Sequence, residues 1–381
     1  MKLLHLGDLH LGRSLAEFDL IEDQRYILEQ VLKIIEEQAI DAVLIAGDVY
    51  DKSVPSEAAT NLLDWFLCSL AKKNVDTYLI SGNHDSDDRL NYGSRLFENS
   101  RIFISSIFDG RLAKYTIKKN DEEADIWLLP FVKASQVRHF YEDAEINSYE
   151  DAVRAILDNA VIDESRSNIL VAHQFVAGKS ERPALGGSES LGTQSVGLVE
   201  MIGANLFDKF DYVALGHIHS PQQVGRKEVR YSGSPLKYSL SEVNNEKSVP
   251  VITINDKKTE VELVPLKPLR DMRHIKGKFS ELLDAKNISD TNDYIYATLT
   301  DEDFINDAMS IFQQTYPYTV KIDYDNSRTR GAEQVNVTAF TASKSFSELI
   351  GDFYKMMYKT EITDEEMEIM RDVAREAGAL K

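Results

Sequence analysis

The sequence contains almost no cysteine, with Cys68 as the only one in 381 residues. A disulfide framework within the chain is therefore impossible, and a zinc site built from thiolates is excluded. No run of 18 or more apolar residues occurs, so no segment is expected to span a membrane. The first ten residues carry Asp8 and His10 inside their apolar stretch and offer no small-residue cleavage site. We therefore expect no signal peptide and a cytoplasmic protein.

Basic residues are also scarce, because 43 Lys and Arg face 63 Asp and Glu, which gives a net charge of −20. Such a balance counts against a simple DNA-binding protein, which carries a basic surface. Two interpretations stay open. Either the substrate is not a polyanion, or bound metals and a partner subunit supply the positive field.

The apolar fraction of 43% is ample for a packed core. Over the first 220 residues, short β-rich apolar runs alternate with amphipathic helical patterns, which is typical of an α/β domain with buried sheets. Helices are expected at Gln24–Gln38 and Ser56–Lys72, and a Gly- and Ser-rich loop is expected at residues 177–197. Seven strands are expected: Lys2–Leu6, Ala42–Ala46, Thr77–Ile80, Asn168–Ala172, Tyr212–Leu215, Val249–Ile254 and Thr259–Val264.

Beyond the connector bracketed by Pro265 and Pro268 the pattern changes, which indicates a domain boundary. A small α/β module is expected from a strand, a helix and a second strand at Tyr294–Leu299, Asp303–Thr315 and Thr319–Tyr324. Two helices should follow, because Ser345 with Glu348 and Thr363 with Glu366 form capping-box patterns. We therefore divide the chain into residues 1–267, a capping domain at 268–340 and C-terminal helices at 341–381.

Metal-binding residue types directly follow five of the expected strands. Five of the eight histidines take part in this pattern. In α/β sheets, ligands bind outside the carboxyl ends of the strands, so these side chains should converge on one place. A structural role for a single strand-end histidine is ordinary, but chance does not account for the whole set. The residues are Asp8 and His10, Asp48, Asn83 and His84, His173, and His217 and His219.

The donor set combines carboxylate, imidazole and amide groups without a thiolate, which favours Mn²⁺, Fe²⁺ or Zn²⁺ over Ca²⁺. Seven donors are too many for one tetrahedral ion and fit two ions that share one carboxylate. Two such ions stabilise both oxygens of an in-line phosphoryl displacement and activate a water as nucleophile. A serine or cysteine nucleophile is then unnecessary. Gly47, Gly82 and Gly216 allow the sharp turns that this crowded edge requires.

The ordered blocks Asp-x-His, Gly-Asp, Gly-Asn-His-Asp, His and Gly-His-x-His resemble the calcineurin-like metallophosphoesterase superfamily. Further segments resemble the bacterial SbcD nuclease family within it: Gly47–Asp51, Tyr231–Tyr238 with Glu242, and the connector at 265–270. The resemblance covers essentially the whole chain. It implies a four-layer α/β/β/α sandwich with a small α/β capping domain and C-terminal helices.

The resemblance also implies roles for individual residues. Asp8, His10, Asp48 and His219 would hold one metal, and Asp48 would bridge to a second held by Asn83, His173 and His217. His84 would face the scissile phosphate, stabilise its charge or protonate the leaving oxygen. Asp51 stands where other relatives carry a histidine, and its carboxylate is expected to orient His84. Asp85 either supports its loop or binds metal.

Members of this family cut duplex DNA ends as 3′–5′ exonucleases, cut single strands and hairpins as endonucleases, prefer Mn²⁺ and act with an SbcC-type coiled-coil ATPase. The sequence has no G-x-x-x-x-G-K-[ST] motif, so an ATP dependence would come from that partner. The C-terminal helices would pack on the chain's own cap or dock on the partner's coiled coil. Family members form homodimers, and heterotetramers with the ATPase. Here the helices at Ser56–Lys72 and Arg89–Phe97 would form the dimer contact or serve the core alone, with Cys68 as a small buried residue.

Two other functions remain to be weighed. The first is a related metallophosphoesterase that acts on a small phosphodiester or a phosphoprotein, which the active-site blocks alone do not exclude. The connector, cap and tail helices argue against it. The second is a scaffold with a decayed site, which a complete donor set argues against.

Overall fold

The computed structural model describes residues 1–120, 122–178, 183–184, 201–327, 329, 347, 350–351, 354–355 and 362–376. By its contacts the chain divides into two units. The first contains residues 1–275, 283–297 and 307–322, and the second contains 276–282, 298–306 and 323–381. Within the described ranges, no helix is both long and apolar enough to cross a membrane.

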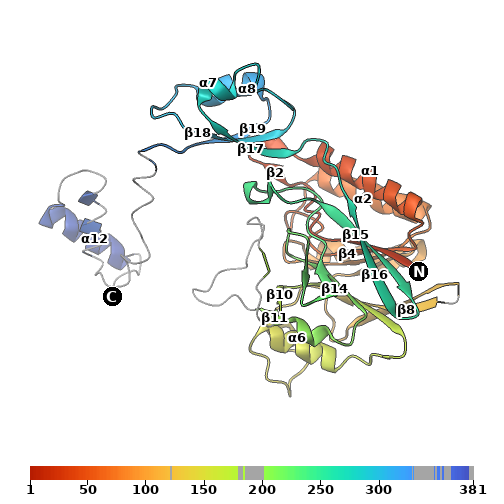
Figure 1. Ribbon diagram of the computed structural model, residues 1–381. Helices are drawn as coiled ribbons and strands as arrows, with labels where there is room; N and C mark the ends of the chain where they lie inside the picture. Colours follow the sequence, from red (N-terminus) through yellow and green to blue (C-terminus); the bar gives the residue numbers. More distant parts are fainter. Residues whose placement is uncertain are drawn as a thin grey trace. The chain divides into compact units, whose positions relative to one another are not determined.

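Two six-stranded sheets form the frame of the first unit (Figure 1). In the first sheet the order is β16 (Lys258–Pro265), β15 (Ser248–Asn255), β1 (Lys2–Leu6), β4 (Ala42–Ala46), β5 (Asp76–Ile80) and β6 (Ile102–Ser105). In the second it is β13 (Gln222–Val224), β14 (Arg226–Tyr231), β12 (Tyr212–Gly216), β9 (Ser167–His173), β8 (Glu122–Leu129) and β7 (Ala113–Lys119). Strands β1, β4, β5 and β6 are parallel, as are β8, β9, β12 and β14.

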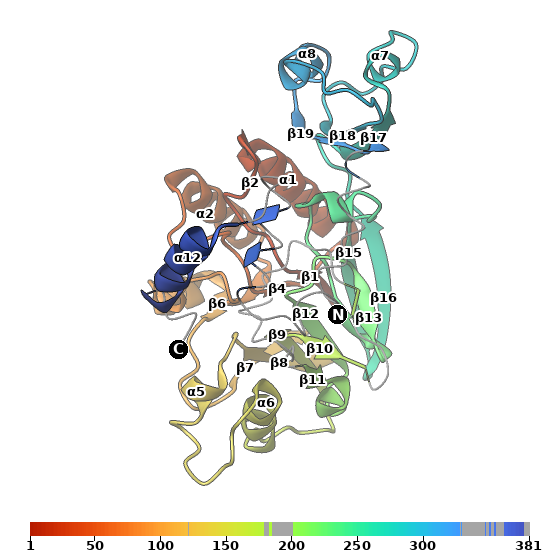
Figure 2. The same ribbon diagram turned by 90° about the vertical axis from the view of Figure 1, so that its left-hand side faces the viewer.

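Three apolar clusters fill the spaces between four layers, which Figure 2 shows in order from α1 and α2 through both sheets to α6. Helices α1 (Ile21–Gln38) and α2 (Glu57–Lys72) pack on one face of the first sheet. Helix α6 (Tyr149–Asp158) packs on the outer face of the second sheet. The sheets pack on each other through alternate residues of their central strands, such as Leu44 and Val171. This is the expected α/β/β/α sandwich.

The remaining helices and strands lie outside the two large sheets. The largest group is a three-stranded sheet of β17 (Met272–Gly277), β18 (Tyr294–Leu299) and β19 (Thr319–Tyr324). The others are β2 (Ser14–Leu15), β3 (Phe18–Asp19), α3 (Asp87–Asn91), α4 (Ser94–Phe97), α5 (Ala134–Val137), β10 (Val176–Ala177), β11 (Ile202–Gly203), α7 (Phe279–Leu282), α8 (Ala308–Thr315) and α12 (Asp364–Glu376).

The second unit contains α7 and α12. Two main-chain hydrogen bonds connect its separate segments. The amide of Thr300 donates to the carbonyl of Gly277 (3.0 Å), and the amide of Asp325 donates to the carbonyl of Leu299 (2.8 Å). The Thr363 and Glu366 capping box is confirmed at the start of α12. The Glu366 amide donates to Thr363 Oγ1 at 3.3 Å, and the Thr363 amide donates to the Glu366 carboxylate at 2.9 Å.

All seven strands expected before the connector are present, and so are the two early helices. The helix expected at Asp303–Thr315 begins only at Ala308, because Asp307 has a left-handed backbone (φ 52°) and interrupts it. Cys68 was expected to be buried and is exposed, because it lies on the solvent side of α2. The loop glycines Gly186, Gly187, Gly192 and Gly197 lie outside the described residues. So does most of the helix expected from Ser345, including Phe346, Leu349, Phe353, Met356 and Met357.

Candidate metal centre

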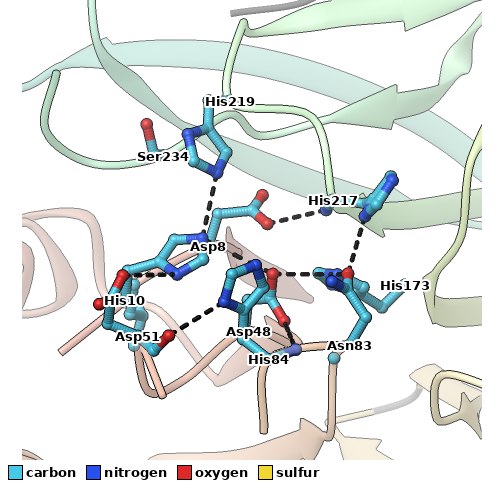
Figure 3. A network of polar contacts seen from close by, with 12 residues as sticks. Asp8, His10, Asp48, Asp51, Asn83, His84, His173, His217, His219 and Ser234 are labelled. Carbon is cyan, nitrogen blue, oxygen red and sulfur yellow. Dashed lines mark hydrogen bonds and ion pairs between the residues drawn. The ribbon is translucent and has the colours of Figure 1, made fainter. Parts of the chain in front are cut away.

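The predicted donors meet at the carboxyl ends of β1, β4, β5, β9 and β12 (Figure 3). The first three strands belong to one sheet and the last two to the other. Strands β9 and β12 are in register, with His173 opposite Gly216, so the second sheet delivers His173, His217 and His219 at the same level. Two parallel sheet edges therefore face each other across the site, and each contributes ligands.

The backbone at the site is held in uncommon conformations. Asp8 (φ 54°), His10 (φ 43°), Asp48 (φ 47°) and His217 (φ 101°) all have positive φ, although none is glycine. Each such residue costs about 1–3 kcal/mol of conformational free energy. The conformation therefore persists only where the surrounding structure enforces it. The main chain helps to enforce it here, because the amides of Asp8 and His10 donate to the carbonyls of Gly47 (3.1 Å) and Asp48 (2.9 Å).

Close approach of the loops requires glycine at two positions. A Cβ on Gly216 would lie 1.9 Å from the carbonyl oxygen of Ala46, and one on Gly82 would lie 2.2 Å from Oδ1 of Asp48. Gly216 therefore lies close against the end of a strand of the other sheet, and Gly82 lies close against the Asp48 carboxylate. Both glycines therefore serve the packing of the site, as their position at strand ends predicted.

One half of the site contains Asp8, His10 and His219, all buried. Their candidate ligand atoms lie within 4.8 Å of one another. The Nε2 atoms of His10 and His219 are 3.1 Å apart. Asp8 uses one carboxylate oxygen to accept a hydrogen bond from the amide of His217 at 2.8 Å, which leaves the other oxygen for a further partner.

The other half contains Asn83, His173 and His217. Oδ1 of Asn83 lies 3.1 Å from Nε2 of His173 and 2.9 Å from Nδ1 of His217. His173 is oriented from behind, because its Nδ1 donates to the carbonyl of Ala46 at 2.8 Å. That donation leaves Nε2 as the atom that faces the centre.

Asp48 connects the two halves. Its Oδ2 lies 3.6 Å from Nε2 of His10 and 3.3 Å from Nε2 of His173. Its Oδ1 accepts a hydrogen bond from the amide of His84 at 2.9 Å. One carboxylate therefore contacts residues of both halves, and the seven expected donors form one continuous group.

The electrostatics follow from burial and from Asp48. Burial alone would disfavour charge on both partners, but the mutual attraction of Asp48 and His173 outweighs it. This attraction lowers the pKa of Asp48 below its usual range and raises the pKa of His173 to about 9. Burial, together with the charge of His173, lowers the pKa of His217 to about 3. Burial also raises the pKa of Asp8 to about 6 and lowers the pKa of His10 well below its ordinary value.

The group fits divalent metal ions. Oδ2 of Asp8 is buried without a hydrogen-bond partner among the described residues, and such a group is costly unless something binds it. Imidazole and carboxylate groups here place their candidate ligand atoms within 4.8 Å of one another. Mixed nitrogen and oxygen donors of this kind are the ligands of Mn²⁺, Fe²⁺ and Zn²⁺.

His84 lies beside this group, with its ring centroid 4.8 Å from that of His10. Its Nδ1 donates to the main-chain carbonyl of Asp51 at 2.9 Å. The Asp51 carboxylate instead pairs with Nη1 of Arg13 at 2.9 Å and lies 3.7 Å from Nδ1 of His10. The expectation that the acid of Asp51 orients His84 is therefore corrected, because that contact comes from the main chain.

A buried ion pair supports His219 from behind. Nδ1 of His219 lies 3.4 Å from Oε1 of Glu242, whose other oxygen accepts from Nζ of Lys247 at 2.6 Å. Lys247 also donates to the carbonyl of His219 (2.9 Å) and to Oγ of Ser234 (2.8 Å). His219 and Lys247 together hold the pKa of the Glu242 carboxyl far below its usual range despite burial.

Sequence reasoning gave Glu242 and Ser234 no role, although both stand in the Tyr231–Glu242 segment that carried the family resemblance. The sequence also gave no sign of a second supporting contact, which holds the main chain at His10. Nε2 of Gln24, at the start of α1, donates to the carbonyl of His10 at 2.7 Å.

Asp85 accepts hydrogen bonds from the amides of Gly82, Val49 and Tyr50 at 2.9–3.0 Å. These contacts support the loop, which is one of the two roles expected of Asp85.

Fold and donor set together define a metal-dependent phosphoesterase. A family model for calcineurin-like phosphoesterases matches residues 1–221, and a model described as the type 5 capsule protein repressor C-terminal domain matches residues 268–358. The SbcD subunit of the SbcCD nuclease of Staphylococcus saprophyticus subsp. saprophyticus is 34% identical over 330 residues, which cover 84% of each chain. A dimetal phosphatase from Danio rerio has a TM-score of 0.41 and 9% identity, over 71% of this chain and 98% of that one. The chain therefore belongs to the calcineurin-like phosphoesterases and, within them, to the SbcD family.

Proposed function

We propose that the chain is the Mn²⁺-dependent nuclease subunit of an SbcCD-type complex that processes DNA ends in repair, recombination and replication. It would act as a double-strand 3′–5′ exonuclease and as an endonuclease on single strands and hairpins. The observation that carries this proposal is the relative named as an SbcCD nuclease subunit, with its match over 84% of both chains. The complete donor set, with no expected ligand missing, supports phosphodiester chemistry.

In this proposal Asp8, His10, Asp48 and His219 hold one metal ion, and Asp48, Asn83, His173 and His217 hold the second. When bound, the two ions polarise the scissile phosphate and make a water nucleophilic at neutral pH. Asp48 keeps its negative charge between the two sets of ligands. Main-chain and side-chain contacts hold the imidazoles in the orientations that metal binding needs.

His84 is proposed to handle the proton of the leaving group. Its Nδ1–H donates to the Asp51 carbonyl, which fixes that nitrogen as a donor. Nε2 is then the atom that carries the exchangeable proton, and it would protonate the leaving oxygen or stabilise the charge that develops there. Asp51, together with Arg13, would keep the loop that presents its carbonyl in position.

The domain division is proposed as residues 1–267 for the nuclease domain, 268–340 for the cap and 341–381 for attachment to the ATPase. Exposed apolar side chains on α12 support the last assignment: Ile369 is 64%, Met370 39% and Val373 56% exposed. A large coiled-coil ATPase would also explain how a chain of net charge −20 engages DNA.

A homodimer, and with the ATPase a heterotetramer, completes the proposal. Leu62, Phe66 and Leu90 are buried in the chain's own core and are not available to a second copy. Tyr92 (85% exposed) and Leu96 (73% exposed), in the same region, are available. We therefore assign the dimer contact to the segment from α3 to α4.

The proposal is tested by comparing Mn²⁺-dependent cleavage of a DNA hairpin with hydrolysis of p-nitrophenyl phosphate, each with and without the ATPase. We expect hairpin cleavage that requires Mn²⁺ and increases with the partner. Turnover of the small ester without any cleavage of DNA, even with the partner present, would overturn the nuclease assignment and leave a small-ester phosphoesterase.

A further inference from the structure

A cavity of about 360 Å³ lies in the first unit, and none of the metal ligands is among the residues that line it. Its walls come from the start of α1, the segment Pro235–Lys237, the turn Asn245–Lys247 and the connector that begins at Pro265. Buried apolar side chains cover much of its surface, among them Leu20, Leu236, Leu266 and Met272. Mostly apolar cavities with a few fixed polar groups are the usual binding places for small organic molecules.

One wall carries a buried acid whose hydrogen bonding is incomplete. Asp23 is only 1% exposed. Its Oδ2 accepts from Nη1 of Arg270 at 2.7 Å and from the hydroxyl of Tyr294 at 2.9 Å. Its Oδ1 has no hydrogen-bond partner among the described residues. Buried carboxylate oxygens rarely lack a hydrogen bond, so Oδ1 is expected to accept one from a bound ligand.

The charges on the walls decide what kind of donor fits. Each basic group is already paired with an acid: Lys237 with Asp271 (2.8 Å), Lys247 with Glu242, and Arg270 with Glu22 and Asp23. The acids are not all paired, because Glu246 makes no ion pair with any described residue. The carboxylate oxygens left without a basic partner among the described residues are Oδ1 of Asp23 and those of Glu246, so a ligand that carries N–H donors fits these walls.

We propose that this cavity binds a small organic cation with a flat apolar body, such as an aryl amine or an amidine. Its N–H groups would donate to Oδ1 of Asp23, with Glu246 adding attraction at the rim. Its ring would lie against Leu236 and Leu266. Charge-assisted hydrogen bonds to a buried carboxylate are among the strongest available to such a ligand.

The cavity shares a wall with the metal centre, because Lys247 lines it and also supports His219 through Glu242. A ligand that shifts Lys247 would change the position of Glu242 and so the orientation of His219. We therefore expect the occupant to alter metal affinity in the half that contains His219. This coupling rests on the proposed metal site, whereas binding in the cavity does not.

Binding is tested on the full chain by ligand-observed NMR with benzamidine as the probe and benzoate as the matched anion. Benzamidine should bind, benzoate should not, and Asp23→Asn should weaken benzamidine by about tenfold or more. Asp23→Asn also alters the pairing of Arg270, so a second variant is needed. Glu246→Gln changes an exposed rim residue and should weaken benzamidine severalfold, whereas Glu262→Gln, exposed on β16 and outside the cavity, should not. Equal binding of the two probes, or benzamidine binding that neither Asp23→Asn nor Glu246→Gln changes, would overturn the proposal.

Coupling is tested by calorimetric titration of Mn²⁺ into metal-free protein with and without saturating benzamidine. We expect benzamidine to change the affinity of one Mn²⁺ site and not the other. At the same benzamidine concentration the change should be smaller in Asp23→Asn. Unchanged Mn²⁺ affinity with benzamidine bound would refute the coupling, and it would do so without bearing on nuclease activity.

Discussion

The two halves of the metal centre are held in place by different means. Behind His219 stands the side chain of Glu242, itself paired with Lys247. Behind His173 stands the main-chain carbonyl of Ala46. Main-chain support survives any substitution that preserves the fold, whereas side-chain support is lost with one residue. The half that contains His219 should therefore be the more sensitive to changes outside the ligands themselves.

The largest effect should come from Asp48→Asn, because the Asp48 carboxylate lies against histidines of both halves. Replacing the carboxylate removes the negative charge that the proposed ions would share. We expect the rate of DNA cleavage to fall by about 10⁴-fold, which corresponds to several kcal/mol of lost transition-state stabilisation. Calorimetry should show weaker Mn²⁺ binding in both halves. Loss confined to one ion would contradict the bridging role of Asp48.

His84→Gln should produce the next largest effect and should leave both halves intact. The main-chain amide of His84 donates to Asp48, and a glutamine retains that amide. Removing the ring should lower kcat by about 10²- to 10³-fold, as for loss of a general acid. Mn²⁺ affinity, measured by calorimetry, should stay close to that of the wild type. A variant that cuts as fast as wild type would contradict the proposed role of the ring.

The position of the metal donors and most of the strands could be predicted from the sequence. The donors directly follow apolar runs, and parallel strands end at one edge of a sheet, so chain order alone placed all seven together. The early strands were identified as short apolar runs that alternate with amphipathic helices, and the last two before the connector as apolar runs on either side of a turn. Glycines that precede Asp48 and Asn83 indicated where the backbone must turn sharply.

The supporting contacts could not be predicted in the same way. Glu242 reaches His219 from 23 residues along the chain, and Gln24 reaches the carbonyl of His10 from a helix that reads as a plain amphipathic element. Neither contact leaves a periodic or spaced signal, because it depends on how loops fold in three dimensions. Asp51 shows the same limit of sequence reasoning. Its residue type suggested that its carboxylate orients His84, whereas its main-chain carbonyl makes the contact to His84.

Removing the metals should destabilise the protein, because the empty site would leave Oδ2 of Asp8 buried and without a hydrogen-bond partner among the described residues. Mn²⁺ present at about 100 times its Kd should add about 2.7 kcal/mol to the free energy of unfolding. For a chain of this size, that is a rise in Tm of several degrees. Differential scanning fluorimetry with Mn²⁺ and with EDTA measures the difference. In Asp48→Asn the difference should shrink, and an undiminished one would place the stabilising ion elsewhere.

Glu242→Gln should have the smallest effect and the most selective one. The substitution keeps the shape of the side chain but removes the charge behind His219 and leaves Lys247 without its buried partner. Loss of a carboxylate that supports a histidine ligand costs about 10- to 100-fold in metal affinity. We expect that loss for one Mn²⁺ only, in the half that contains His219, while the ion near His173 binds as in the wild type. Glu262→Gln, at an exposed position on β16, controls for the change of charge and should leave both affinities unchanged. Equal weakening of both ions by Glu242→Gln would mean that the halves are not supported independently, because Asp48 would then transmit the disturbance from one ion to the other.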